Sequence, residues 1–399
     1  MSPFRVLALL PLFFACAAEA QDMPGMDMSA TDLMSMARPM TGVLGRYPMT
    51  REASGTSWQP DAAAHDMLHA SLDGWELMGH AMLDGVFDSQ SGRRGGTQWF
   101  VEGMAMGQAR RDLDADDVLN LRLMLSPDAL MGARGYPLRL AGGETADGTT
   151  PLIDRQHPHD LVMEMAGSFS HALSSADSLF VYGGYPGEPA LGPPAFLHRA
   201  SGMDIPEAPI SHHWLDSTHI TFGVATLGFV HDDWKLEVSR FTGREPDQYR
   251  FDFDPARFDS TSARLTWNPG AHWSLQASWG YLVSPEQLSP RQNETRYTAS
   301  AEYVDGPFAA TLAWGHKLES DAVLLEGEYR LGDWTALLRA EHLQNSEFFG
   351  NADKVSPGLI HDWRVSDHAR LGLGGLFDVD FTQGGHAHGA MLFARLVAD

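Results

Sequence analysis

Six methionines lie within the eighteen residues from Met23 to Met40, in a stretch that begins Gln-Asp-Met-Pro-Gly-Met-Asp-Met at residue 21. The stretch has no sustained helical or strand periodicity, and its Met-x-Met and Met-x-x-Met spacings would let several thioether sulfurs meet at one ion. Thioether sulfur is a soft ligand that favours Cu(I). The sequence therefore predicts a Cu(I)-binding segment whose ligands are Met23, Met26, Met28, Met34 and Met36. The alternative is a disordered linker in which the methionines are incidental.

Histidines form a second and separate group of candidate metal ligands. His157 and His159 end one long connection between apolar stretches, and His212 and His213 lie in the next. Neutral imidazole beside a carboxylate suits Cu(II), Zn(II) or Ni(II). We expect these four histidines to account for any Cu(II) or Zn(II) binding, the alternative being that they are ordinary surface side chains. A further pair at 386 and 388 ranks lower.

The sequence does not predict an enzyme. It contains no Gly-x-Ser-x-Gly, His-Glu-x-x-His or Walker sequence. A hydrolase with a Ser/His/acid site could draw on Ser211 and His212, or on Ser168 and His171, but nothing in their spacing supports it. We therefore expect no enzymatic activity.

Charge excludes nucleic acid as a partner, because phosphate contacts need a basic surface. The formal net charge is −24, and the chain has only three lysines. The mean hydropathy of −0.23 suits a soluble protein and equally a membrane barrel, in which each lipid-facing residue alternates with a polar one.

The elements that must position these ligands are apolar/polar alternating stretches, which recur about every twenty residues from residue 73 to 399. Very short turns rich in Gly, Asp and Asn join them at 113–116, 231–234, 267–270, 304–307 and 331–334. Longer connections at 132–159, 187–218, 243–259 and 344–355 come between these turns. Alternation over ~10 residues, with long loops on one side only, is typical of an outer-membrane β-barrel.

We predict an all-β fold, a transmembrane antiparallel β-barrel of about sixteen strands. The expected strands lie near 74–87, 97–112, 117–131, 160–173, 178–186, 219–230, 234–243, 260–268, 272–283, 295–304, 307–317, 322–331, 334–344, 355–365, 369–381 and 388–398. The alternative is a soluble two-sheet sandwich in which the aromatic residues form the core.

The hairpin at 322–344 predicts which face looks into the lumen. Charged side chains would be costly in lipid, so the charged face is expected to line the lumen. That face carries Glu326, Glu328, Arg330, Arg339 and Glu341. The opposite face, with Val323, Leu325, Tyr329 and Leu338, is expected to contact lipid. A two-residue Gly332-Asp333 turn would place Glu326 opposite Arg339.

Two of the long connections are too apolar and aromatic for solvated loops. Residues 155–160, 192–199 and 209–214 read Arg-Gln-His-Pro-His-Asp, Gly-Pro-Pro-Ala-Phe-Leu-His-Arg and Pro-Ile-Ser-His-His-Trp. We expect these long loops, all on one rim, to fold toward the lumen.

The start of the chain has the pattern of a secretory signal. Arg5 precedes an apolar run at 6–14, and Ala18-Glu19-Ala20 is a small-x-small cleavage site. Acylation of Cys16 is the competing interpretation. The expected organisation is a signal peptide at 1–20, a largely disordered Met-rich periplasmic segment at 21–72 and an outer-membrane barrel at 73–399.

Residues 21–40 resemble the Met-rich N-termini of periplasmic and outer-membrane copper-resistance proteins of the CopB kind. The loop sequences resemble those of a group of proteobacterial outer-membrane barrels, and no activity accompanies that second likeness. The first implies copper ions as the bound metal and periplasmic copper proteins as partners, besides outer-membrane lipid. Three functions stay open: copper handling, a general porin or small-solute channel without a metal role, and a structural barrel plugged by its own loops.

Overall fold

The computed structural model describes residues 40–64, 66–92 and 94–399. Contacts divide the chain into residues 1–40 and a compact unit of residues 41–399. The predicted signal peptide and the candidate ligands Met23, Met26, Met28, Met34 and Met36 lie outside the described residues.

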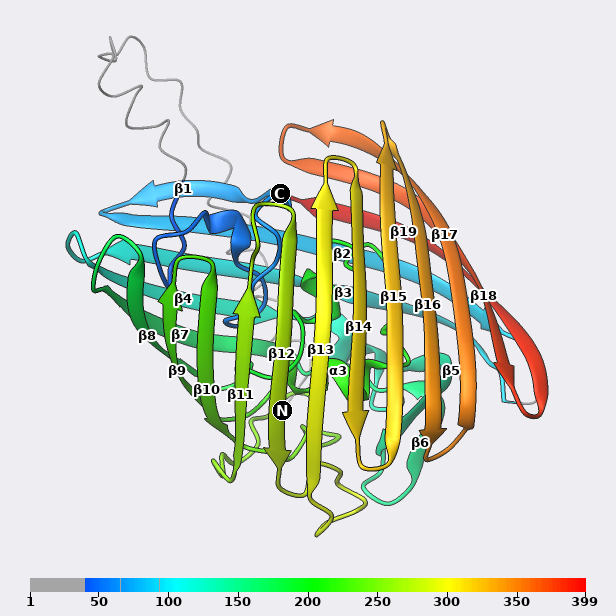
Figure 1. Ribbon diagram of the computed structural model, residues 1–399. Coiled ribbons are helices and arrows are strands. Elements are labelled where there is room, and N and C mark those ends of the chain that lie inside the picture. Colours follow the sequence, from blue (N-terminus) through cyan, green and yellow to red (C-terminus); the bar gives the residue numbers. More distant parts are fainter. Residues whose placement is uncertain (1–39, 65, 93) are drawn as a thin grey trace. The chain divides into compact units, whose positions relative to one another are not determined.

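The compact unit is a closed antiparallel β-barrel of sixteen strands (Figure 1). The strands are β2 (Trp75–Gln90), β3 (Thr97–Asp112), β4 (Asp117–Leu125), β7 (Val162–Ala172), β8 (Asp177–Gly184), β9 (Val224–His231), β10 (Trp234–Phe241), β11 (Ser260–Trp267), β12 (Trp273–Leu282), β13 (Glu294–Asp305), β14 (Phe308–Lys317), β15 (Ser320–Leu331), β16 (Trp334–Ser346), β17 (Gly350–Ser366), β18 (Ala369–Thr382) and β19 (Gly385–Ala398). Consecutive strands pair, and the β19–β2 pairing closes the ring. The prediction of an all-β sixteen-stranded barrel is confirmed, and the soluble sandwich alternative is wrong.

Three further strands lie outside the ring. β1 (Leu68–Leu72) forms a hairpin with the start of β2, while β5 (Tyr136–Thr145) and β6 (Pro151–Gln156) form a separate hairpin. The helical turns are η3 (Met49–Arg51), η4 (Pro127–Met131), η5 (Phe196–His198), α3 (His212–Leu215) and η6 (Ser217–His219). Among the described residues, no helix has both the length and the apolar character needed to cross a membrane.

Side chains alternate between the two faces of the barrel wall, with the apolar ones outside. In β10, Leu236 and Val238 are exposed, whereas Lys235, Glu237 and Ser239 are fully buried on the lumen side. A soluble protein shows the opposite distribution, because apolar side chains gain free energy by leaving water. This inverted pattern is that of a barrel whose outer face contacts lipid.

The tight hairpins fix the register of these two faces. Leu331 pairs with Trp334 across a two-residue turn, in which Gly332 has a φ of 60°. Turns of this kind match the twist of the strands but need positive φ, which glycine adopts without strain. In the resulting register Glu326 lies opposite Arg339, and their side chains hydrogen-bond at 3.2 Å.

The exposed position of Leu325, in the middle of β15, leads to a stability prediction. Leu325→Arg should lower the free energy of unfolding in lipid vesicles by about 2–4 kcal/mol, because a lipid-facing charge costs most at mid-membrane. Leu331→Arg, beside the short turn, should cost only about 0–1 kcal/mol. Urea titration of both variants measures the two costs. Equal costs at the two positions would contradict the orientation of this hairpin.

Two long segments fill much of the lumen. The first is residues 41–64, here called the N-terminal insert, with Val43, Leu44, Tyr47 and Trp58 buried. Arg51 joins it to the short β9–β10 turn by an ion pair with Asp233 of 2.9 Å. From its sequence this stretch is predicted to be part of a largely disordered segment. It is ordered instead, because the lumen wall supplies partners for its polar groups.

The second part is residues 186–223, here called the loop insert, which connects β8 to β9. Every residue of the loop insert is buried except His198, Ala200 and Met203. Its apolar side chains form one cluster with the β5–β6 hairpin; the members include Leu138, Leu140, Phe196, Leu197, Ile205, Ile210, Trp214, Leu215 and Ile220. The long loop therefore folds into the lumen, as the sequence predicts.

Buried ion pairs attach the loop insert to the opposite wall. Arg199 contacts Glu326 of β15 at 2.5 Å and Asp216 of the insert itself at 2.7 Å. Glu207 accepts from Lys354 of β17 at 2.8 Å. Charges on the lumen wall are thus matched by charges on the insert, which keeps both from being buried without a partner.

Candidate metal sites in the lumen

Methionines on the lumen face of β2, β3 and β4 form a continuous row. Met82 pairs with Met104 across β2 and β3, and Met106 pairs with both His80 and Met124. Met82, Met104 and Met124 are buried. Neighbouring strands thus bring sulfur atoms from three segments to one patch of wall.

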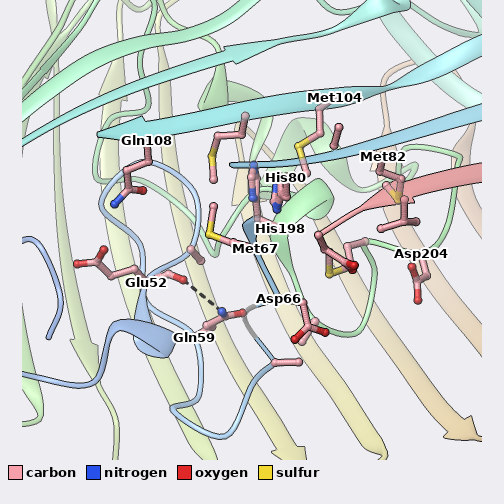
Figure 2. A pocket seen from close by; sticks show the side chains of 18 of the residues that line it. Glu52, Gln59, Asp66, Met67, His80, Met82, Met104, Gln108, His198 and Asp204 are labelled. Atoms are coloured by element: carbon pink, nitrogen blue, oxygen red, sulfur yellow. Dashed lines mark hydrogen bonds between the residues drawn. The ribbon is translucent and has the colours of Figure 1, made fainter. Parts of the chain in front are cut away.

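The loop insert and the residues before β1 complete this patch into a cavity (Figure 2). Its sulfur- and imidazole-bearing lining residues are Met67, His80, Met82, Met104, Met106, His198 and Met203. The His80 and His198 rings are stacked with centroids 6.0 Å apart, and His198 Nε2 lies 3.3 Å from the Met124 sulfur. We call this space the Met/His cavity.

The Met/His cavity lies toward the short-turn end of the barrel. Arg330, Arg370 and Asp399, which are next to short turns or the chain end, belong to its lining. Carboxylates of Asp66 and Asp204 line it as well. Its volume of about 100 Å³ is enough for an ion with a few waters.

The donor set of this cavity suits a soft metal ion. Thioether sulfur and neutral imidazole together favour Cu(I), whereas Mg²⁺ and Ca²⁺ require oxygen ligands. The cavity offers these donors from a fixed wall and from the insert, so an ion could be held without any thiolate. The chain's single cysteine, Cys16, lies outside the described residues.

These methionines are not among the ligands predicted from the sequence, although the sequence contains a signal for them. Residues 103–107 read Gly-Met-Ala-Met-Gly inside an expected strand, and alternation places both methionines on one face. Met82 and Met124 lie on the two adjoining strands. Attention to sulfur on strand faces, rather than only in the low-complexity segment, would have found the row.

Five histidines meet at a second place in the lumen. His157, His159, His212 and His213, all proposed from the sequence, are joined there by His219. Ring centroids lie 5.2 Å apart for His159–His219 and for His212–His219, and 5.8 Å apart for His157–His213. The two long connections are therefore brought together.

Some of these rings are fixed by acceptors. His159 Nδ1 lies 2.8 Å from Asp128, and His212 Nδ1 lies 2.9 Å from Asp216. His219 Nδ1 donates to the backbone carbonyl of Asp216 at 2.8 Å. Nδ1 of each of these three rings is thus already engaged in a contact. When Nδ1 carries the proton, the lone pair of the ring is on Nε2.

Electrostatics keeps several of these imidazoles neutral. Burial, with smaller effects of His159 and His212, lowers the pKa of His219 to about 3. Burial also lowers the pKa of His157 well below its ordinary value, and that of His212 despite the contact with Asp216. For Asp216, burial would raise the pKa, but the charge of Arg199 and the hydrogen bond with His212 hold it well below its usual range.

The remaining candidates are separate from these sites. Ser211 Oγ donates to Glu341 at 2.7 Å while His212 contacts Asp216, so this serine and histidine have different partners. Ser168 faces the lumen and His171 the outer surface. His386 and His388 are exposed on β19.

The charged face of the β15–β16 hairpin lies where the sequence places it. Glu326, Glu328, Arg339 and Glu341 are buried on the lumen side, while Arg330 is half-buried and contacts Glu328 at 2.6 Å. The residues on the outer face of the hairpin are exposed; they are Val323, Leu325, Tyr329 and Leu338. Register therefore assigns each side chain to one face.

Comparisons with protein-family models and with curated proteins gave no match. Solved structures of outer-membrane proteins are similar in fold. OmpF of Salmonella typhi, in complex with daunomycin, is 8% identical with a TM-score of 0.54, over 83% of this chain and 100% of that one. OprB of Pseudomonas putida is 7% identical with a TM-score of 0.52, over 82% and 94% of the two chains. The outer-membrane channel DcaP of Acinetobacter baumannii is 10% identical with a TM-score of 0.50, over 82% and 98%.

The chain has the barrel fold of these porins. At such low identity the likeness concerns the fold alone, and the contents of the lumen must be interpreted from this chain's own residues.

Proposed function

We propose that this protein is a bacterial outer-membrane barrel that binds soft metal ions, Cu(I) above all, inside a lumen largely filled by its own chain. The observation that carries the proposal is the Met/His cavity, in which strand methionines face His80 and His198. Thioether and imidazole donors in one cavity favour Cu(I) over the common divalent ions of the periplasm.

The apolar outer face and the porin-type fold support the outer-membrane location. The other functions considered from the sequence are less well supported. A general diffusion pore needs a water-filled lumen, whereas both inserts are buried within this one. A purely structural plug has no need for a row of methionines on three strands. Nothing about the inserts calls for catalysis, so we propose a binding rather than an enzymatic role.

The N-terminal methionines extend the proposal. Met23, Met26, Met28, Met34 and Met36 are proposed to capture Cu(I) in the periplasm and to deliver it to the Met/His cavity, with periplasmic copper proteins as donors or acceptors. Exchange between thioether sites needs no change in ligand type. Passage through the barrel would then require movement of the loop insert, which covers the cavity with His198 and Met203.

A sulfur-deletion experiment tests the cavity. Met82→Leu combined with Met104→Leu preserves side-chain bulk and removes two sulfurs, so the affinity for Cu(I) should fall about 10- to 100-fold in competition with a chromogenic Cu(I) chelator. Met165→Leu, on the exposed outer face of β7, is the matched control and should bind like the parent.

A second variant, with the five N-terminal methionines replaced by leucine, separates the two proposed regions. If only that variant loses Cu(I), the tail rather than the cavity is the site. If neither variant binds more weakly than the parent, the soft-metal function is wrong and a channel or structural function takes its place.

A further inference from the structure

Three side chains from three different long connections converge in the lumen, away from the methionines. They are His213 of the loop insert, Glu245 between β10 and β11, and Glu286 between β12 and β13. One ligand atom from each lies within 4.8 Å of the other two. His213 and Glu245 are each 6% exposed or less, and Glu286 is half-buried.

The hydrogen bonding of this cluster is incomplete. Glu245 Oε1 accepts from Ser217 Oγ at 3.0 Å, but Glu245 Oε2 is buried without a hydrogen-bond partner. His213 Nδ1 lies 3.5 Å from Glu245 Oε1 and is also buried without a hydrogen bond. Buried polar atoms are nearly always satisfied, so two unsatisfied atoms in one cluster indicate a missing partner.

The space beside the cluster is kept open by a glycine. A Cβ on Gly143 would lie 3.7 Å from His213 Cε1 and 3.8 Å from Glu286 Oε2, and the φ of 118° at this position disfavours any side chain. The rings of His212 and His157 lie nearby, with centroids 5.6 Å and 5.8 Å from that of His213. Backbone rather than a side chain therefore borders the cluster on this side.

The cations near the cluster already have other carboxylate partners. Arg296, which donates to Ser217, forms an ion pair with Glu294 at 2.7 Å. Lys317 Nζ lies 3.8 Å from Glu286 Oε1 and 3.7 Å from Glu294 Oε2, so one ammonium group serves two carboxylates. Arg250 is engaged by Glu144 and Asp160. No Lys or Arg among the described residues lies within ion-pair distance of Glu245, whose ionic partner is His213.

We propose that His213, Glu245 and Glu286 form a binding site for a divalent cation of borderline hardness, Zn(II). One imidazole and two carboxylates supply nitrogen and oxygen donors that neutralise the ion, and a water can fill the fourth position. Donor atoms around a tetrahedral zinc lie about 3.4 Å apart, so the half-buried Glu286 needs only a small rotation to close the site. No thioether lies among these ligands, which separates the site from the Met/His cavity.

The site does not depend on the proposed soft-metal function. Its three ligands come from the loop insert and two rim connections, so a bound ion would tie the insert to the long-loop end of the barrel. Zinc would then make removal of the insert from the lumen harder.

Binding of zinc to the purified full-length barrel tests the proposal. After dialysis against EDTA, titration calorimetry with ZnSO₄ should give one binding site, and Co(II) should give visible absorption bands of a low-coordinate nitrogen/oxygen site. Glu245→Gln and Glu286→Gln, which preserve shape, should each weaken zinc binding about 10- to 100-fold or more. His342→Gln removes an exposed imidazole paired with Asp353 and should leave binding unchanged.

The zinc titrations distinguish a metal site from a simple ion pair between His213 and Glu245. Heat-modifiable migration on a gel shows whether each variant retains its barrel. A parent that binds no zinc, or glutamine variants that bind like the parent, would show that His213 and Glu245 form only an ion pair. The Met82/Met104 double variant should keep its zinc affinity, so loss of Cu(I) binding in that variant and loss of zinc binding here are separate results.

Discussion

Replacing Arg199 with methionine should lower the free energy of unfolding by about 3–5 kcal/mol, the usual cost of leaving a buried ion pair with one partner. The Arg199 side chain is fully buried and donates to Glu326, Asp216 and the carbonyl of Pro194. Methionine fills much of the same volume but leaves two carboxylates short of a cation, with Arg339 still near Glu326 at 3.2 Å. Urea titration in lipid vesicles measures the loss.

The same change should loosen the loop insert from the wall. We expect Arg199→Met to show ion conductance in planar bilayers more often than the parent. Without Arg199, the carboxylate of Glu326 lacks one of its ionic partners and can bind water and cations that enter the lumen. Arg199→Met combined with Glu326→Gln should recover part of the stability, since it removes the uncompensated charge. Arg240→Met, on the exposed outer surface, is the control. A parent-like stability of Arg199→Met would show that the insert is not held by this ion pair.

His219 should make the free energy of unfolding depend on pH. Its pKa is lowered to about 3 in the folded chain by burial and by the neighbouring His159 and His212, against an ordinary value of about 6.5 when unfolded. Between these two pH values the unfolded chain binds the additional proton. Stability contributed by neutral His219 is therefore complete above pH ~6.5 and is lost as the pH falls toward ~3, by about 1.4 kcal/mol per pH unit.

His219→Gln removes this dependence. As the pH falls from ~6 to ~4, the free energy of unfolding of the variant should rise relative to that of the parent by about 1.4 kcal/mol per pH unit. A constant difference caused by the substitution itself does not affect this slope. Comparing slopes cancels the titration of groups that both proteins share. Unfolding measured at several pH values in that range gives the two slopes, with the exposed His171→Gln as control. Parallel curves for parent and His219→Gln would contradict a buried neutral imidazole.

The barrel wall could be predicted from sequence because each strand carries its own information. Lipid on one side and polar contacts on the other impose alternation along every strand, as between Leu325 and Glu326, and short turns such as Gly332-Asp333 set the register. Both signals are local. Alternation and short turns can therefore be recognised without knowing which distant residues are in contact.

The contents of the lumen could not be predicted in this way. Arg199 pairs with Glu326 across 127 positions, and His213 meets Glu245 and Glu286 from separate loops. No periodicity connects such residues. The N-terminal insert belongs to a segment that is predicted to be largely disordered, because that segment lacks a sustained helical or strand period. Its order comes from partners on the lumen wall, such as Asp233 for Arg51.

The charged lumen wall has a consequence for the energetics of opening. In a barrel with both inserts removed, Glu326, Arg339 and Lys354 would regain full hydration, so docking the loop insert exchanges ion–water contacts for ion pairs of similar free energy. The hydrogen bonds between strands take no part in that exchange. The free energy that holds the loop insert in the lumen must therefore come mainly from the apolar cluster it shares with the wall rather than from its ion pairs.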